Sequence, residues 1–175
     1  MDNKSFEATL SMLDAEVNFL EILHGQPTMV TVTAFSGGFY SGRRQTRDHS
    51  NLLGMKPKVP GVVTAPLMLQ FRPAVGGYKL VIKNTGKHYD KLIRKSWLET
   101  LGVDGPKLGS PTVLTLLDHQ NRTLTRENNT AAHSPVSLMT QNNKYIGGLK
   151  VRGSPYLYLA ETEEKSKITF LLSLL

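Results

Sequence analysis

Cationic side chains at regular spacing are the residues of this sequence that are best suited to chemistry. Four of them lie after a short apolar run: Lys87, Lys91, Arg94 and Lys95. Five more lie in an earlier polar stretch: Arg43, Arg44, Arg47, Lys56 and Lys58. Lysine and arginine donate hydrogen bonds to phosphate, and arginine does so with a fork of donors. We therefore expect these nine residues to bind anions, either an anionic membrane surface or nucleic acid in a ribonucleoprotein.

Residue types that usually catalyse reactions or bind metals show no such pattern. The histidines are far apart, and none has a second histidine four residues away. No phosphate-binding, dinucleotide-binding or zinc-protease motif is present. The absence of cysteine excludes disulfides, thiolate metal ligands and cysteine nucleophiles. The sequence therefore predicts a non-enzymatic protein with no cofactor and no metal, and no small-molecule substrate is evident.

Charge is distributed unevenly along the chain. The 175 residues carry a formal net charge of +7, yet residues 1–25 hold five carboxylates and a single lysine. A basic surplus attracts anionic partners over long range. We therefore divide the chain into an acidic N-terminal segment, residues 1–25, and a single basic domain, residues 26–175.

Apolar residues near the N-terminus recur in steps of three and four. They are Phe6, Leu10, Leu13, Val17 and Leu20. This spacing predicts an amphipathic helix over residues 5–23, which Ser5 would cap and Gly25 and Pro27 would end. Two interpretations of its apolar side remain open. It packs against its own domain, or it mediates self-association by docking on the basic face of a neighbouring subunit in a homo-oligomer.

The segment from Tyr78 to Gly102 changes its hydrophobic period in the middle. Residues 78–82 alternate, which is typical of a strand, and residues 89–101 follow a period of 3.6. A basic amphipathic helix near residues 87–101, ended by Gly102, is therefore expected. Most other segments are short β-branched runs between turn residues. The predicted fold class is α+β: one domain with a mostly antiparallel sheet and two helices.

A threefold repeat supports an alternative fold. Apolar runs that begin at Val30, Leu80 and Val136 each have an aromatic residue nine positions later. Leucine-rich strands close the three units: residues 67–71, 112–117 and 168–172. This pattern predicts a β-trefoil with an N-terminal helix, acting as a cytosolic binding module for carbohydrate or protein. A helix at residues 89–101 would be incompatible with it.

Residues 78–125 resemble the core of rhabdovirus-type matrix proteins. The shared order is a strand (YKLVIKN), a turn, a helix that contains Trp97, glycines at 102 and 105, and an apolar strand (TVLTLLD). The resemblance implies a viral structural protein that self-associates and bridges anionic membrane and ribonucleoprotein. The chain departs from that family in its acidic N-terminal segment and in lacking P-P-x-Y and P-[TS]-A-P motifs.

The sequence also predicts where the protein acts. Acidic residues interrupt the N-terminal apolar pattern, so a signal peptide is not expected. No run approaches the roughly 18 apolar residues that a spanning helix needs. We therefore expect a cytoplasmic protein, located peripherally on a membrane or in a virion.

Overall fold

The structure is a computed structural model that describes residues 4–36, 39–96, 99–104 and 109–175, with residues 32–36 and 39–44 described by their backbone. The strands are β1 (Phe6–Ser11), β2 (Ala15–Phe19), β3 (Met29–Ser36), β4 (Phe39–Asp48), β5 (Leu53–Pro57), β6 (Leu67–Ala74), β7 (Gly77–Ile82), β8 (Arg94–Lys95), β9 (Leu101–Gly102), β10 (Val113–Leu117), β11 (Thr123–Leu124), β12 (His133–Thr140), β13 (Tyr145–Lys150), β14 (Leu157–Thr162) and β15 (Phe170–Leu174). The helices are α1 (Leu20–His24) and the 3-10 turn η1 (Glu164–Ser166).

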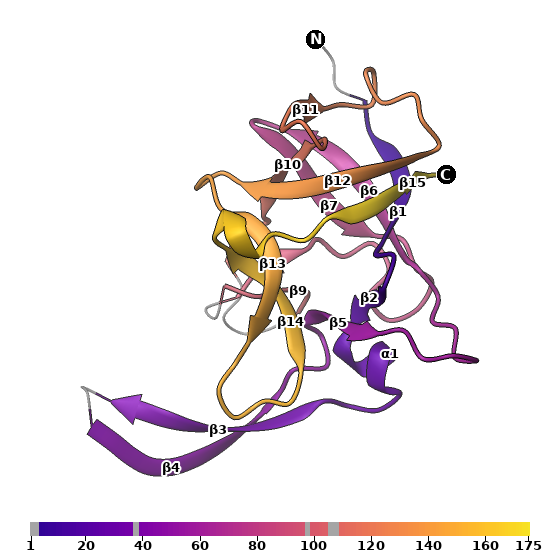
Figure 1. Ribbon diagram of the computed structural model, residues 1–175. Coiled ribbons are helices and arrows are strands. Elements are labelled where there is room, and N and C mark those ends of the chain that lie inside the picture. The colour runs from indigo at the N-terminus through magenta and orange to yellow at the C-terminus, as the bar shows by residue number, and fades with distance from the viewer. Residues whose placement is uncertain (1–3, 37–38, 97–98, 105–108) are drawn as a thin grey trace.

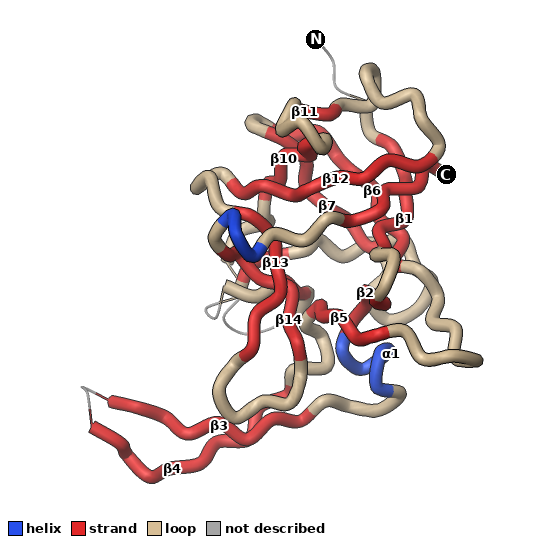
Figure 2. The backbone as a smooth tube through the Cα atoms, viewed as in Figure 1, coloured by secondary structure: helices blue, strands red, loops and turns tan. Residues whose placement is uncertain are grey.

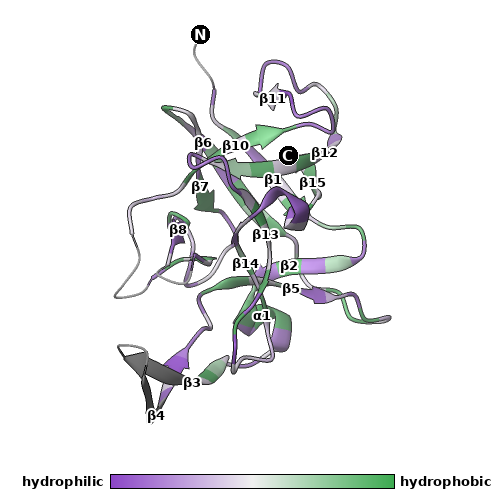
Figure 3. Ribbon diagram, turned by 60° about the vertical axis from the view of Figure 1, so that its left-hand side comes forward, coloured by the Kyte–Doolittle hydropathy of each residue, from purple (hydrophilic) through white to green (hydrophobic). Residues whose placement is uncertain are grey.

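Six strands close an antiparallel barrel in the upper part of Figure 1. Their order around the barrel is β1, β6, β7, β10, β12 and β15, and β15 pairs with β1 to complete the circle. Leu10 of β1 lies opposite both Leu67 and Leu172. Alternate residues of each strand point inward, as the pleat of a strand requires, and they form one buried apolar cluster. Figure 3 shows hydrophobic residues on β7 and β10 and hydrophilic ones along the loop that carries β11.

Three hairpins cover one end of this barrel. They are β2 with β5, β8 with β9, and β13 with β14. The hairpins also pair with one another, because Tyr158 lies opposite Gly54, Leu52 opposite Gly102, and Thr100 opposite Ala160. The barrel strands and hairpins therefore form three units of strand, hairpin and strand: unit 1 (residues 6–74), unit 2 (residues 77–117) and unit 3 (residues 133–174).

The α+β prediction is wrong, because strands hold 51% of the described residues and helices hold 5%. Among the described residues, helix is confined to α1 and η1, which are blue in Figure 2. The order of strands and hairpins is that of the alternative prediction, a β-trefoil of three units. The N-terminal helix that this prediction also included is not formed. The repeat in the sequence also misplaced unit 1, which begins at β1 and not at Val30.

The predicted N-terminal helix over residues 5–23 is β1, a turn, β2 and the first residues of α1. Phe6 and Leu10 fit a helical spacing, but Ala8 between them is apolar and buried too, so the same residues also alternate. Pairing with β6 and β15 on both sides decides between the two periods, because tertiary context overrides local propensity. The acidic segment thus supplies one barrel strand, β1, and continues into β2 of a covering hairpin.

The predicted basic helix near residues 87–101 is also wrong. Ile93 N–H donates to the Leu80 carbonyl and Ile82 N–H donates to the Lys91 carbonyl, both at 2.9 Å, so this segment pairs with β7. Asp90 and Glu99 adopt positive φ angles of 66° and 63°, which interrupt any helix. Trp97, which was expected in this helix, lies outside the described residues.

Strands β3 and β4 form an arm that projects away from the barrel (Figures 1 and 2). They pair with each other in a two-stranded sheet of their own. The arm is inserted into the hairpin of unit 1, after β2 and α1 and before β5. No helix in the described part of the chain has the length and apolar character needed to cross a bilayer.

Candidate nucleic-acid interface

The arm places cations along its length and aromatic residues toward its end. Its register runs from Met29 opposite Asp48 to Ser36 opposite Phe39, with one irregularity after Thr33. Arg44 lies opposite Thr33, and Arg47 lies opposite Val30. Phe35 lies opposite Tyr40, next to the Ser36 and Phe39 pair. The three arginines that the sequence singled out in this stretch are therefore all on β4.

Buried polar side chains anchor the base of the arm. His49 N–H donates to the Thr28 carbonyl at 2.9 Å, and Thr28 N–H donates to Ser50 Oγ at 2.9 Å. His49 Nδ1 lies 2.6 Å from the Tyr158 hydroxyl, which lies 2.6 Å from Ser154 Oγ. His49 is 5% exposed and Tyr158 is fully buried. These bonds fix both strands of the arm to unit 3.

The charge state of this anchor follows from its burial. Burial lowers the pKa of His49, and the nearby Arg47 guanidinium lowers it further. Burial also raises the pKa of the Tyr158 hydroxyl. Hydrogen bonds from the hydroxyl and N–H of Ser50 lower the pKa of Asp48. At neutral pH the anchor is therefore an uncharged histidine and tyrosine beside an ionised carboxylate.

A second basic segment lies beside the arm. Lys150 and Arg152, at the end of β13 and in the loop after it, are both exposed. A Cβ placed on Gly153 would lie 3.1 Å from the Thr31 carbonyl oxygen, so this loop touches β3, as Figure 1 shows. We call residues 29–36, 39–48 and 150–154 together the basic arm surface. It holds five cations, Arg43, Arg44, Arg47, Lys150 and Arg152, and a single carboxylate, Asp48.

The cations expected on the basic helix are held in contacts within the chain. Lys87 lies 2.7 Å from Glu21, and Lys91 pairs with Asp104. Lys95 lies 2.9 Å from Glu99 and 3.3 Å from Glu161. Arg94 Nη1 donates to the Gly109 carbonyl at 3.3 Å. These four residues do not form the uncompensated basic face that a helix would have presented.

The remaining predicted site residues lie elsewhere. Lys56 of β5 donates to the Leu23 carbonyl at 3.4 Å, and Lys58 follows β5 at the mouth of a cavity. Four of the five residues expected to mediate self-association are buried within the chain: Phe6, Leu10, Val17 and Leu20. Leu13 is 82% exposed, in the turn between β1 and β2. The apolar seam thus packs in its own domain, apart from Leu13.

Sequence reasoning missed Lys150, Arg152 and the anchor at His49. The stretch KVRG at residues 150–153 has two cations before a glycine, which is the one local signal present. Nothing in the sequence spacing indicates that His49 contacts Tyr158 or that Gly153 lies against Thr31. Their contact is a product of the pairing between β5 and β14.

A polar groove of about 600 Å³ lies between units 2 and 3. Its charged lining residues are Lys95, Lys144, Lys165, Glu99, Glu161 and Glu163. Lys144 pairs with Glu163, and Lys95 pairs with the other two carboxylates. The charges of the groove compensate one another, so it has no preference for an anion or a cation. Within the described residues, no group of three histidines or carboxylates could hold a metal ion.

No protein-family model matches this chain, and comparisons with curated proteins and with solved structures find no match.

Proposed function

We propose that this protein is a non-enzymatic nucleic-acid-binding protein that holds its ligand with the basic arm surface. The observation that carries the proposal is a two-stranded ribbon that projects from a closed barrel and joins a second basic loop, with five cations and one carboxylate. An isolated two-stranded hairpin is marginally stable in water, so a ligand bound along the arm would stabilise it further.

The shape of the arm suits a duplex. The major groove of B-form DNA admits a two-stranded β-ribbon, and several DNA-binding proteins use strands in this way. Arginines along β4 and cations at the base would neutralise phosphates on either side of the groove. The aromatic positions toward the end of the arm suit stacking on bases or insertion at a base step.

A membrane surface is a weaker match. Cations near anionic lipid contribute about 1 kcal/mol each when they share a plane at the surface. The nine cations expected to bind anions are divided between the arm, β5 with the residue after it, and the segment after β7. Lys87, Lys91 and Lys95 are in ion pairs. The helix that carried the resemblance to matrix proteins is replaced by strands and turns, so that resemblance adds no support.

Binding of fluorescent oligonucleotides at a series of salt concentrations tests the proposal. The probes are a DNA duplex of about two helical turns, the matching single strand and an RNA hairpin. We expect the DNA duplex to bind most tightly, because the A-form groove is too narrow for a ribbon. The triple variant Arg43→Gln, Arg44→Gln, Arg47→Gln is expected to lower the slope of log K against log salt by about 2 to 3.

The matched control is Lys87→Gln, Lys91→Gln, Lys95→Gln, which removes the same charge from ion-paired positions. It should keep most of the affinity, and melting curves of both variants show that they are folded. Equal losses in the two triple variants would contradict a site on the arm. Tight binding to anionic vesicles with no affinity for any oligonucleotide would make the membrane the partner instead.

A further inference from the structure

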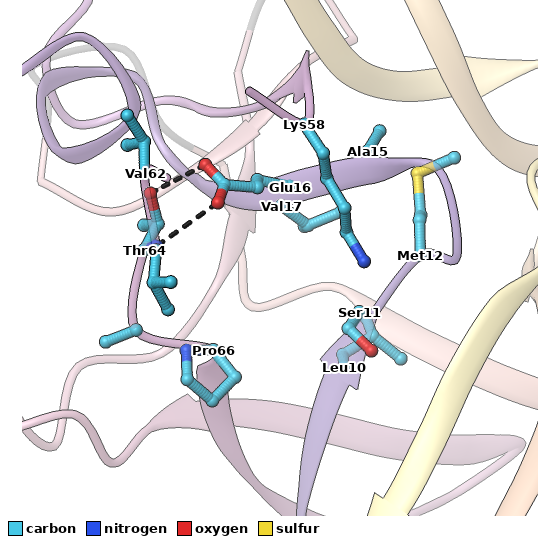
Figure 4. A pocket seen from close by; sticks show the side chains of 12 residues that line it. Leu10, Ser11, Met12, Ala15, Glu16, Val17, Lys58, Val62, Thr64 and Pro66 are labelled. Carbon is cyan, nitrogen blue, oxygen red and sulfur yellow. Dashed lines mark hydrogen bonds between the residues drawn. The ribbon is translucent and has the colours of Figure 1, made fainter. Parts of the chain in front are cut away.

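A cavity of about 270 Å³ opens between β1, β2 and the connection from β5 to β6, residues 58–66 (Figure 4). Its walls are mainly apolar and are made by Leu10, Met12, Ala15, Val17, Val62 and Pro66. Ligand pockets for drug-sized molecules begin at about 300 Å³, so this cavity suits a smaller molecule. It lies on unit 1, away from the cations of the arm.

The connection from the hairpin to the last strand is held by different hydrogen bonds in unit 1 than in units 2 and 3. In unit 2 the Thr112 N–H donates to the Ile93 carbonyl at 3.2 Å, and in unit 3 the Ile168 N–H donates to the Ile146 carbonyl at 3.1 Å. These backbone bonds hold the corresponding connections directly against the hairpins.

In unit 1 a backbone bond from Lys58 N–H to the Asp14 carbonyl, at 3.4 Å, holds the start of the connection, and side chains hold its end. Glu16 accepts hydrogen bonds from Thr64 N–H at 3.1 Å and from Thr64 Oγ1 at 2.6 Å. Asn18 Nδ2 donates to the Ala65 carbonyl at 2.9 Å. A side-chain link is longer than a direct backbone bond, so the connection stands away from β2. The cavity is the space that this spacing leaves.

The cavity lining carries one ammonium group, that of Lys58, and one carboxylate, that of Glu16. The Lys58 side chain extends into the opening toward Ser11, as Figure 4 shows, and it forms no ion pair with the described residues. Both carboxylate oxygens of Glu16 already accept from Thr64. The ammonium group and the Ser11 hydroxyl are thus the polar groups available to a ligand head, and the walls beyond them are apolar.

Exposed apolar residues also lie around this cavity. Val62 and Val63 of the connection are 55% and 93% exposed, and Leu13 of the neighbouring turn is 82% exposed. Exposed apolar residues gathered at one cavity are typical of a ligand-binding site. A ligand tail entering here would remove apolar surface from water.

We propose that this cavity binds a small amphipathic carboxylate. The carboxylate group lies on Lys58 Nζ and Ser11 Oγ, and the aliphatic chain lies against Met12, Val17 and Val62. This site is independent of nucleic-acid binding, since it shares no residue with the basic arm surface.

Octanoate is the probe, and titration calorimetry with amide NMR spectra is the measurement. Octanoate is expected to shift the amide signals of Ser11 and Thr64. Lys58→Met keeps the apolar stem and removes the charge, and it is expected to weaken binding about tenfold or more. Lys56→Met, two residues earlier, removes the same charge outside the cavity and should bind as the unchanged protein does.

Two further controls separate the charge from the cavity. Octylammonium has the same chain and the opposite charge, and it is expected to bind much more weakly than octanoate. Ala15→Leu places additional atoms in the cavity and is expected to abolish binding while the protein melts normally. The proposal fails if octanoate leaves the Ser11 and Thr64 signals unchanged, if both lysine variants lose affinity equally, or if octylammonium binds as tightly.

Discussion

The buried side chains of His49 and Tyr158 join the arm to β14 of unit 3. The Tyr158 hydroxyl lies between His49 Nδ1 and Ser154 Oγ, at 2.6 Å from each. Buried polar groups are stabilising when they are paired, and removal of one partner leaves the others without a bond. The Tyr158 hydroxyl is therefore expected to contribute to the stability of the domain.

Tyr158→Phe tests that dependence. The substitution keeps the ring and removes the oxygen, and we expect a loss of about 1 to 3 kcal/mol in the free energy of unfolding. Urea denaturation measures it. Tyr89→Phe is the matched control, because Tyr89 is 52% exposed and should show almost no change. Equal stability of the two variants would mean that the anchor contributes nothing.

Acid should destabilise the protein through its partly buried histidines. Burial lowers the pKa values of His24, His49 and His88 in the folded state. Below the unfolded value of about 6.5 the unfolded chain binds protons that the folded chain does not, so the free energy of unfolding falls. We expect it to fall steadily from about pH 7 to about pH 5, before the carboxylates titrate.

Two histidine variants identify the source of this pH dependence. His49→Gln should flatten the plot of unfolding free energy against pH, whatever its stability at neutral pH. His119→Gln changes an exposed histidine in the turn after β10 and should leave the plot as it is. A slope that is the same in His49→Gln as in the unchanged protein would contradict this assignment.

At the scale of elements, the three hairpins meet at small residues. Each contributes a buried leucine followed by glycine or alanine: Leu53-Gly54, Leu101-Gly102 and Leu159-Ala160. A Cβ on Gly102 would lie 2.7 Å from the Asn51 carbonyl oxygen, and one on Gly54 would lie 2.5 Å from the Leu157 carbonyl oxygen. Backbone atoms are among the nearest neighbours of both glycines, so movement of the Leu20 or Leu52 side chain alone would not make room for a Cβ.

Gly102→Ala is therefore expected to destabilise the domain. Added atoms in a tightly packed region cost about 1 to 3 kcal/mol, and a thermal melt measures the change. Gly109→Ala is the control, because its Cβ would have an ordinary contact of 3.6 Å with the Lys95 carbonyl oxygen. If both variants melt at the same temperature, the hairpins are not closely packed at Gly102.

Sequence patterns predicted some elements and misassigned others for a physical reason. The closing strands at residues 67–71, 112–117 and 168–172 correspond to β6, β10 and β15, because their apolar residues are continuous enough to exclude other structures. Residues 89–101 have a helical period, yet positive φ angles at Asp90 and Glu99 and bonds to β7 override it. Hydrophobic periodicity is a property of one segment alone. It cannot indicate which distant strand that segment will pair with.

At the scale of the whole molecule, the barrel is closed by strands from both ends of the described chain. β1 lies between β6 and β15, so the segment once expected to be a separable acidic helix completes the barrel. The candidate site was less predictable than the fold. Its arginines could be found in the sequence, but Lys150, Arg152 and the cavity at Lys58 depend on contacts between units.

Removal of residues 1–25 tests this role of β1. The truncated protein would have two unpaired barrel edges and would lose the buried Phe6, Ala8 and Leu10. We expect it to be unfolded or aggregated, as judged by narrow dispersion of its amide NMR signals. A folded truncated protein would show that residues 26–175 form a domain alone.

The arm leaves and re-enters the body at one place, where Met29 lies opposite Asp48 and His49 holds both strands. The length of the arm can consequently change without any change in the barrel. Insertion of one residue into β3 and one into β4 would lengthen the arm by about 3.4 Å. This length is close to the rise of one base-pair step. The reach of the protein along a duplex could thus be altered in single base-pair increments, with the barrel left unchanged.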